Sequence, residues 1–310
     1  MGWVCALPVE LAAARVMLDE EYEALDPKAN DTNIYILGRI SEHNVVITCL
    51  PTGRIGTNSA AAVAVRMQSA FTSIRFGLMV GIGAGVPSVE DIRLGDVVVS
   101  RPHNMHGGVV QYDFGKATPG EFVRTGFLNS PPEILLNAIS HIQADQLVGK
   151  SRFSEYLSKL QDIPIFKREH AGPDLLFQAD YNHVGGDTCE KCNKQRLVGR
   201  KPRAEETVVH YGTIASGNQV MRDAAKRDQI STELGSALCF EMEAAGLINS
   251  FPCLVVRGIC DYADSHKNKK WQTYAAGAAA AYAKEVLSAI PTAEVAKSRA
   301  IDEIIREKNG

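Results

Sequence analysis

The sequence predicts an α/β protein with a single domain, built on a central, mostly parallel or mixed, twisted sheet flanked by helices. Short apolar runs rich in β-branched residues alternate along the chain with Ala-rich helical stretches. That alternation is typical of a sheet covered by helices on both faces. Hydrophobic residues make up 45% of the 310 residues, which is enough for one sizeable core.

The expected elements follow from local composition. Runs of Val, Ile and Leu favour extended backbone, whereas stretches rich in Ala, Leu and Glu favour helix. In the first half we expect a strand at 3–7, a helix at 10–21, a strand pair at 33–40 and 44–50, a turn at 51–56, a helix at 57–70, and strands at 77–81 and 96–100. In the second half we expect a helix at 131–144, a strand at 208–215, a helix at 242–250, a strand at 253–259 and a long helix at 271–290. These elements predict one domain over residues 1–290.

Two segments depart from this alternation. Residues 152–203 are polar and contain Gly, Lys and Arg, so we interpret them as an excursion from the sheet. Residues 291–310 are charged and helix-prone. We expect a helical tail or linker there, because a helix of that size is marginal in water unless it docks.

Charge and composition exclude several classes of function. The net charge of -3 and the pI of about 6.3 argue against nucleic-acid and membrane-surface partners, which need a basic patch. No apolar run approaches the roughly 20 residues of a membrane helix. The seven cysteines are odd in number and fall mostly in apolar strand-like runs. We therefore expect a reduced, cytoplasmic protein without a disulfide framework.

Acidic side chains near a helix start and at a strand end give the first functional signal. Glu241 and Glu243 lie at the start of the predicted helix at 242–250, and the buried strand after it ends in Asp261, with Asp264 three residues later. An isolated Glu-x-Glu pair is usually a capping or solvated feature. A strand end, however, is where α/β sheets place reactive groups. The combination predicts a site at this edge of the sheet.

Several segments resemble the purine and uridine phosphorylase superfamily, which includes the methylthioadenosine/S-adenosylhomocysteine nucleosidases and the AMP nucleosidases. The matching blocks are 81–86 with 94–100, 241–246 and 256–264, and 214–218 is a weaker fourth. The resemblance covers about residues 3–290, with 152–203 unmatched. It implies the three-layer α/β sandwich of the nucleoside phosphorylases. It also implies an enzyme that cleaves the N-glycosidic bond of purine nucleosides or nucleotides.

The resemblance also implies roles for individual residues. Asp261 matches the aspartate that protonates or hydrogen-bonds N7 of the leaving base, which requires a protonated carboxyl. Glu243 matches the carboxylate that grips the ribose hydroxyls, and Met242 matches the residue against the sugar face. The remaining substrate-binding residues expected from the matching blocks and turns are Gly83, Ala84, Gly85, Arg54, Ser216, Asn218, Val220 and Cys260.

The N-terminus bears on the nucleophile. Phosphorylases of the superfamily carry a Gly-Asp-Pro-x-Arg loop after the first strand and an Arg before the Gly-rich turn. This chain has 6–10 (ALPVE) and 79–81 (MVG) there, so both cations that would hold phosphate are missing. Glu10 falls at the register of the nucleosidase glutamate that orders the attacking water. Taken alone, Glu10 is better interpreted as a first-turn acid favoured by the helix dipole. With the resemblance, we expect hydrolysis, and phosphorolysis is the alternative.

The side of the pocket that would face the 5′ substituent is less determined. Arg54, in the turn at 52–56, is open to three interpretations: a phosphate ligand, a ligand of a nucleotide 5′-phosphate, or a solvated loop residue. Polar side chains at 103–106 and 111–113 lie in the segment that shapes this pocket in relatives. The basic run 266–270 is either a solvated loop or a source of phosphate-binding lysines.

Cofactors and partners complete the expectations. No cofactor is required for catalysis, but His183, Cys189 and Cys192 have metal-like spacing, with His210 as a fourth ligand of a structural zinc. Otherwise the excursion is a lid packed by ordinary thiols. The expected partner is a small-molecule purine nucleoside or nucleotide, and the resemblance implies a homodimer or a higher homo-oligomer. A catalytically silent nucleoside-sensing module of a larger signalling protein is the alternative from another class.

Overall fold

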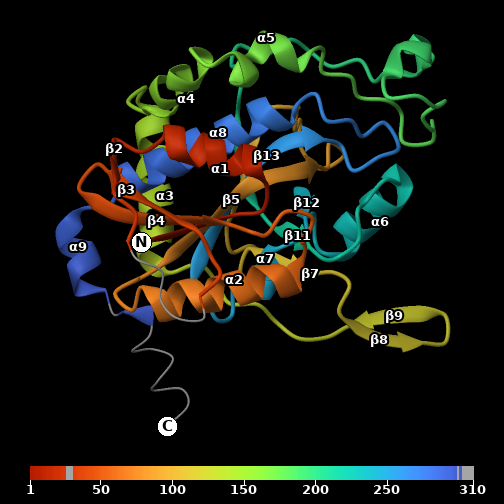
Figure 1. Cartoon of the computed structure of the whole chain (residues 1–310). Helices are drawn as coiled ribbons and strands as arrows, with labels where there is room; N and C mark the ends of the chain where they lie inside the picture. Colours follow the sequence, from red (N-terminus) through yellow and green to blue (C-terminus); the bar gives the residue numbers. More distant parts are fainter. Residues whose placement is uncertain (26–30, 299, 302–310) are drawn as a thin grey trace.

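The computed structural model describes residues 1–25, 31–298 and 300–301. One mixed sheet dominates them, with its main path in the order β10-β6-β13-β5-β1-β4-β3-β2 (Figure 1). Its strands are β1 (Gly2–Cys5), β2 (Glu20–Tyr22), β3 (Tyr35–Ile40), β4 (His43–Cys49), β5 (Gly77–Gly85), β6 (Val97–Ser100), β7 (Val109–Gln111), β10 (Val209–Gly212), β11 (Ile214–Ser216), β12 (Cys239–Glu241) and β13 (Cys253–Asp261). Strands β12, β11 and β7 join in turn at the end of β5, beside the main path. A separate hairpin is formed by β8 (Gly115–Thr118) and β9 (Glu121–Arg124).

Helices cover both faces of the sheet. On one side lie α1, α4 and α8, and on the other lie α2 and α7 (Figure 1). The helices are α1 (Pro8–Val16), α2 (Thr57–Ala70), α3 (Glu133–Leu147), α4 (Phe153–Gln161), α5 (Arg168–Ala171), α6 (Ala224–Glu233), α7 (Ala244–Leu247), α8 (Gln272–Ser288) and α9 (Thr292–Lys297), with short 3-10 turns η1 (Pro164–Phe166), η2 (Cys189–Lys191) and η3 (Lys194–Arg196). The predicted α/β fold class with a helix-flanked central sheet is therefore confirmed.

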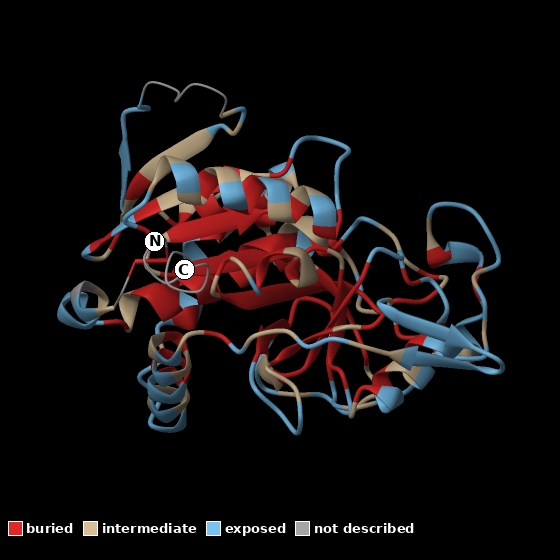
Figure 2. Cartoon of the chain, turned by 90° about the horizontal axis from the view of Figure 1, so that it is seen from below, coloured by how far each residue is buried: buried red, intermediate tan, exposed pale blue. Residues whose placement is uncertain are grey.

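The two central strands explain why the core has two halves. All nine residues of β13 are buried, and β13 runs parallel to β5 from the Cys253–Gly77 pair onward. Along β13, Leu254 packs into one apolar cluster and Val255 into the other, because successive strand side chains point to opposite faces. Figure 2 shows the central sheet as continuously buried, whereas the β8–β9 hairpin is exposed. The run of apolar residues in the sequence is thus that of a strand covered on both sides.

Several predicted elements need correction. The helix expected at 10–21 ends at Val16, because the chain turns and adds β2 to the edge of the sheet. The strand expected at 208–215 divides into β10 and β11, which pair with different neighbours. The helix expected at 242–250 is only α7, and Glu241 ends strand β12 instead of starting a helix. Pairing of β12 with β11 and β5 overrides the helix propensity of the Glu-Met-Glu-Ala-Ala run.

The excursion and the tail contain little regular structure. In the excursion, α4 packs against α8, and residues 172–203 contain only the short turns η2 and η3. In the tail, α9 ends at Lys297, and residues 302–310 of the predicted tail helix lie outside the described residues. Among the described helices, none has both the length and the apolarity needed to cross a membrane.

A glycine sets the distance between the sheet and α8. A Cβ on Gly258 of β13 would lie 1.8 Å from the carbonyl oxygen of Ala275 in α8, so the backbones themselves must separate to admit it. We expect Gly258→Ala to lower the free energy of unfolding by roughly 3 kcal/mol, the upper part of the usual range for overpacking. Gly199→Ala, where a Cβ meets nothing within 4 Å, should stay within about 0.5 kcal/mol of the wild type. Denaturant unfolding measures both, and equal stabilities would contradict the close-approach argument.

Candidate active site

A cavity of about 240 Å³ opens where β5, β12 and β13 end. Carboxyl ends of neighbouring parallel strands such as β5 and β13 are the usual place for a site in an α/β sheet. The lining residues are Ala6, Leu7, Glu10, Ile55, Ile82, Gly83, Ala84, Gln219, Val220, Met221, Phe240, Glu241, Met242, Glu243, Cys260, Lys267 and Gln272. The walls combine apolar side chains with three carboxyl groups, which is the composition of a small-molecule site.

The floor of the site is a buried ion cluster. Arg257 lies on β13 with none of its surface exposed. Its Nη2 donates to Glu241 and lies 3.5 Å from Oε2 of Glu243. A Cβ on Gly81 would fall 2.5 Å from Oε1 of Glu10 and 2.6 Å from Nη1 of Arg257, so glycine is required there and Glu10 belongs to the same cluster. Burial lowers the pKa of Arg257, but the surrounding carboxylates outweigh it and the net pKa is raised.

Glu10 is held rigidly at the cavity wall. Its Oε2 accepts hydrogen bonds from the backbone N–H groups of Ala6 (2.7 Å) and Leu7 (3.0 Å), and its Oε1 accepts one from Ile82 (2.8 Å). Burial raises the pKa of Glu10, although the charge of Arg257 and the three N–H donors oppose that rise. A fixed carboxylate of increased basicity is suited to receiving a proton from water.

Glu243 and Glu241 have different environments. Among the described residues, Oε1 of Glu243 accepts only a 3.3 Å hydrogen bond from the N–H of Gly56. Burial raises the pKa of Glu243 to about 7, although the charge of Arg257 opposes this rise. The carboxylate of Glu241 instead accepts from the N–H groups of Glu243 and Ala244 and from Arg257. Glu241 is therefore committed to the fold, whereas Glu243 keeps capacity for ligand hydroxyls.

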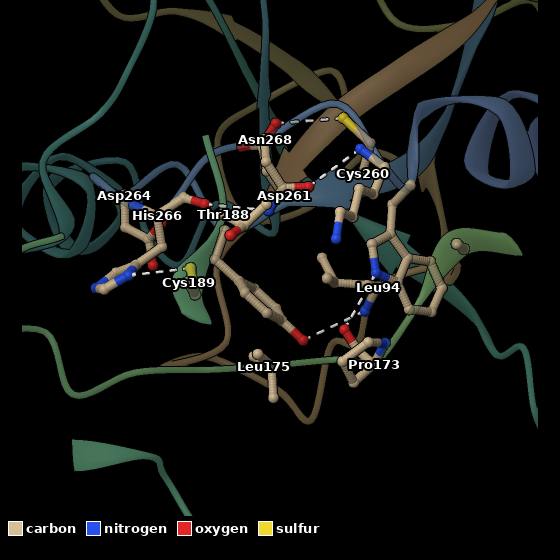
Figure 3. A pocket seen from close by; sticks show the side chains of 14 residues that line it. Leu94, Pro173, Leu175, Thr188, Cys189, Cys260, Asp261, Asp264, His266 and Asn268 are labelled. Carbon is tan, nitrogen blue, oxygen red and sulfur yellow. Dashed lines mark hydrogen bonds between the residues drawn. The ribbon is translucent and has the colours of Figure 1, made fainter. Parts of the chain in front are cut away.

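Asp261 lies at the end of β13 with an unexpected partner. Its Oδ1 accepts from the N–H of Ala263, and its Oδ2 lies 2.9 Å from Nζ of Lys267 and accepts from the Cys260 thiol at 3.2 Å. Figure 3 shows Asp261 and Cys260 among the residues of a smaller adjoining pocket. Cys260 and Lys267 line the main cavity, whereas Asp261 lines only the smaller one. Lys267 thus links Asp261 to the cavity.

Lys267 is the one cationic side chain among the described residues that line the main cavity. Burial lowers its pKa, but the charge of Asp261 and the bond to it produce a net increase. Lys267 therefore stays protonated, and its ammonium is held by a carboxylate.

The other expected binding residues divide into two groups. Those that line the cavity are Met242, Gly83, Ala84, Val220 and Cys260. Those outside its lining are Gly85, Ser216, Asn218 and Arg54.

The residues outside the lining have structural surroundings that explain their places. Gly85 is buried against side chains of the apolar core. Ser216 Oγ accepts from the N–H of Ala245 at the start of α7. Asn218 Oδ1 accepts from the N–H and the hydroxyl of Thr57 at the start of α2. Ser216 and Asn218 therefore stabilise the starts of the helices beside the cavity. Arg54 is exposed in the turn before α2.

The segments expected to shape the 5′ side do not line the main cavity, although the hollow lined by residues 112–113 shares Gln219 with it. Residues 105–106 and 111 line a separate hollow beside the β8–β9 hairpin, and residues 112–113 line another one. The reason is that β7 pairs with β11, after which the chain leaves the sheet to form the hairpin (Figure 1).

Sequence reasoning missed several lining residues and the cluster's cation. The missed lining residues are Ala6, Leu7, Ile55, Ile82, Gln219, Met221, Phe240 and Gln272. For Arg257 a signal was present: an arginine between valine and glycine in an apolar strand must be buried, and a buried charge needs a partner. The two glutamates 14 and 16 residues upstream are those partners.

The metal-like residues of the excursion converge, with one correction. His183, Cys189 and Cys192 lie together with His266 from the loop after β13. His210, expected as the fourth ligand, is instead bonded to Glu90 through Nδ1 (2.8 Å) and close to Asp96 through Nε2 (3.1 Å). It lies on β10, in the sheet, where it cannot reach the cysteines.

Comparison with known proteins gives the class of protein. The chain belongs to the Phosphorylase superfamily, whose family model matches residues 1–294. It is 48% identical over 296 residues to a nucleotide-binding leucine-rich repeat (NLR)-like protein of Hyaloscypha variabilis, covering 94% of this chain and 29% of that protein. It is 27% identical over 287 residues to the ATP nucleosidase Cap17 of Escherichia coli, covering 89% of this chain and 48% of that one. The chain thus spans less than half the length of these two relatives.

A solved structure agrees with the fold. The 5′-methylthioadenosine/S-adenosylhomocysteine nucleosidase of S. pneumoniae, determined with a transition-state inhibitor, aligns with a TM-score of 0.59 at 18% identity, covering 94% of this chain and 99% of that one. This likeness concerns the fold. Together with the family match, it confirms both the resemblance and the three-layer architecture predicted from the sequence.

The raised pKa of Glu243 predicts a pH-dependent stability. Its folded pKa of about 7 exceeds the ordinary 4.5, so unfolding is favoured once the unfolded carboxyl ionises and the folded one does not. This contribution to stability is intact below about pH 4.5 and is lost as pH rises through about 7. The loss amounts to roughly 3 kcal/mol by linkage. We expect Glu243→Gln to flatten the profile by that amount in denaturant unfolding between pH 4 and 8. Glu121→Gln, on the exposed hairpin, is the control, and an unchanged profile for Glu243→Gln would contradict the assignment.

Proposed function

We propose that this protein is a purine nucleosidase that hydrolyses the N-glycosidic bond of adenosine-type nucleosides or nucleotides, releasing free base and a ribosyl product. The observation that supports it most is the pairing in one cavity of Glu10, fixed by three N–H donors, with Glu243, which has free acceptor capacity. Glu10 is suited to accepting a proton from water, and Glu243 is suited to accepting hydrogen bonds from ribose hydroxyls. The nucleosidase names of relatives support the same reaction class.

The proposed reaction divides the work among three carboxyl groups. The bond between C1′ and N9 breaks with its electron pair going to the base. The base receives at N7 a proton that the Lys267 ammonium supplies through the carboxyl group of Asp261, with which it is paired. Glu243 accepts hydrogen bonds from the ribose hydroxyls and stabilises the oxocarbenium-like sugar, with Met242 against its face. Water adds its oxygen to C1′ and gives its proton to Glu10. One water is consumed, and the base leaves neutral.

The charges of the cavity favour water over phosphate as nucleophile. Glu10, Glu241 and Glu243 line it, and the guanidinium beneath them is already shared among these acids. Lys267 is likewise paired with Asp261. A phosphate dianion would meet carboxylates without an unpaired cation among the described lining residues, so its binding would be opposed. Uncharged water carries no such penalty.

Within this proposal, the preferred substrate carries a 5′-phosphate. Lys267 supports this choice because it is a protonated lysine in the cavity wall. A 5′-phosphate is held near it by the binding of the rest of the nucleotide, so it shares the ammonium with Asp261, whereas free phosphate has no such help. Arg54 lies in the turn beside the lining residue Ile55. The name of the E. coli relative, an ATP nucleosidase, agrees with a nucleotide substrate.

The assembly and compartment are part of the proposal. The resemblance implies a homodimer, and exposed aromatic side chains gather on and beside the β8–β9 hairpin at Phe114, Phe122 and Phe127. The seven cysteines are all free, which agrees with a reducing cytoplasm. Light scattering of the purified protein reads the assembly directly, and a monomer would exclude the dimer.

The reaction is tested by following release of free base. We expect adenine from adenosine, AMP and ATP in phosphate-free buffer, with AMP and ATP cleaved faster than adenosine. Chromatography of the reaction mixtures measures both. A requirement for added phosphate would establish phosphorolysis instead, and equal rates for the three substrates would remove the 5′-phosphate preference. No base from any purine substrate in either buffer would overturn the enzyme and favour the silent sensing module.

The assigned residues are tested by isosteric substitution. We expect Asp261→Asn and Glu10→Gln each to lower kcat by at least about 100-fold, as loss of a proton-transfer group does. Glu285→Gln is the matched control, because Glu285 is a buried acid of α8 that accepts hydrogen bonds from the Ser151 hydroxyl and from the N–H of Arg152. Circular dichroism checks that each variant folds. Near-normal turnover by Asp261→Asn would be decisive against its role as the acid.

A further inference from the structure

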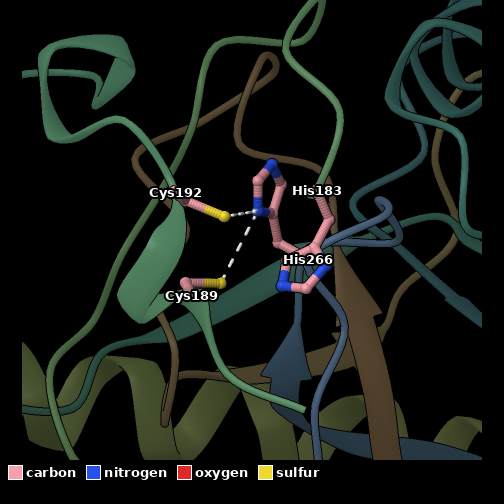
Figure 4. Close-up of side chains that lie close together, drawn as sticks. All are labelled: His183, Cys189, Cys192 and His266. Carbon is pink, nitrogen blue, oxygen red and sulfur yellow. Dashed lines mark hydrogen bonds between the residues drawn. The ribbon is translucent and has the colours of Figure 1, made fainter. Parts of the chain in front are cut away.

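Two cysteines and two histidines converge where the excursion meets the loop after β13 (Figure 4). The residues are His183, Cys189, Cys192 and His266. Each offers one ligand atom, and the four atoms all lie within 4.8 Å of one another. Both cysteines and His266 are buried, so this is an interior cluster in which polar atoms need partners.

The distances between donors are those of a tetrahedral metal site. With Zn–S near 2.3 Å and Zn–N near 2.05 Å, tetrahedral angles place sulfur and nitrogen about 3.6 Å apart. Nδ1 of His266 lies 3.6 Å from Sγ of Cys189 and 3.8 Å from Sγ of Cys192. A single nitrogen lone pair accepts one good thiol hydrogen bond, yet both thiols are directed at it. A cation between them accounts for both approaches.

The orientation of the His266 ring is fixed by contacts on the side away from the cysteines. Its Nε2 lies 3.0 Å from the carbonyl oxygen of Tyr181. Because a carbonyl only accepts, Nε2 carries the proton and Nδ1 presents a lone pair to the cysteines. The ring also stacks on Phe177, with centroids 4.1 Å apart and planes 13° apart. A histidine whose second nitrogen donates to a carbonyl is the usual arrangement of a metal ligand.

His183 is the weakest of the four donors. Its Nδ1 accepts from the N–H of Gly185 (3.0 Å), and its Nε2 lies 3.2 Å from the carbonyl oxygen of Thr188. Binding a metal through either nitrogen requires giving up one of these local bonds. His183 is also only half-buried, so loss of this side chain should weaken a metal site less than loss of His266.

The surrounding segment has little regular structure and a small core. Residues 172–203 contain two 3-10 turns and an isolated bridge between Phe177 and Leu197. Their apolar cluster consists of the buried residues Phe177, Cys189 and Cys192 with a few half-buried neighbours. So small a core rarely orders an irregular segment by itself, and a bound metal is a common substitute for a core.

We propose that His183, Cys189, Cys192 and His266 bind one Zn²⁺ ion, which fastens the 172–203 segment to the loop after β13. Two thiolates and two imidazoles in a tetrahedron are a donor set that selects zinc. The site has a consequence for the cavity, because His266 directly precedes Lys267, the partner of Asp261. Cys189, His266 and Asp261 also line the same small pocket (Figure 3). The ion therefore holds the backbone that positions this ion pair.

Metal content tests the site directly. The protein should be prepared without chelator, with any histidine tag removed. Its metal content is then measured by inductively coupled plasma mass spectrometry. We expect about one zinc per chain. The Cys189→Ser/Cys192→Ser double variant should lose it, and His266→Ala should lose more of it than His183→Ala. Cys49→Ser and His141→Ala, which alter a cysteine and a histidine outside the cluster, are the matched controls and should keep it.

A second readout identifies the ligands independently of activity. Replacement of zinc by Co²⁺ should give the visible bands of a tetrahedral centre and a thiolate charge-transfer band, both absent from the double-cysteine variant. Zinc below about half an equivalent in the wild type, together with no cobalt bands, would overturn the proposal. A Cys189–Cys192 disulfide found by mass spectrometry after alkylation would do the same. None of these outcomes depends on whether the protein cleaves nucleosides.

Discussion

The ion cluster around Arg257 is the constraint on which the rest of the site depends. A fully buried guanidinium is costly unless carboxylates pair with it, and Glu241 and Glu243 do so, with Glu10 lying against the same Gly81. Three acids around one cation leave excess negative charge inside the fold. The raised pKa values of Glu10 and Glu243 show where protons offset it. The same balance therefore leaves Glu10 with a raised pKa and Glu243 with a pKa of about 7, so that Glu243 exchanges its proton near neutral pH.

That balance also restricts what the cavity accepts. The guanidinium of Arg257 is paired with the acids around it, and Lys267 is paired with Asp261. An anion that enters the cavity must therefore displace a carboxylate from one of these cations. A flexible substrate phosphate that reaches Lys267 does this with help from binding energy elsewhere in the substrate. A free phosphate has no such help. Hydrolysis of a nucleotide and exclusion of inorganic phosphate are thus compatible in one site.

The sequence predicts those parts of the fold and the site that depend on local pattern. Helix α2 has the bounds predicted from composition, and β13 extends the predicted strand by only two residues. Glu241 was misplaced on a helix because pairing of β12 with β5, which no local pattern encodes, decides its conformation. Likewise, Cys189 and Cys192 were visible from their spacing, but His266 is 74 residues beyond Cys192, so only the folded chain identifies it. The features that the sequence did not predict are thus those that depend on contacts between residues far apart in the chain.

The loop after β13 connects these points physically. At its start Asp261 is fixed by the N–H of Ala263, and Lys267 closes the loop back onto it. Between them, His266 packs on Phe177 from the excursion. A displacement of the excursion therefore moves the residue next to Lys267, whereas Glu10 and Glu243 are held by β5, α1 and the turn before α2. In the proposed reaction, the half of the site that contacts water and ribose is therefore rigid, whereas the geometry of the half that faces the base depends on how the excursion is anchored.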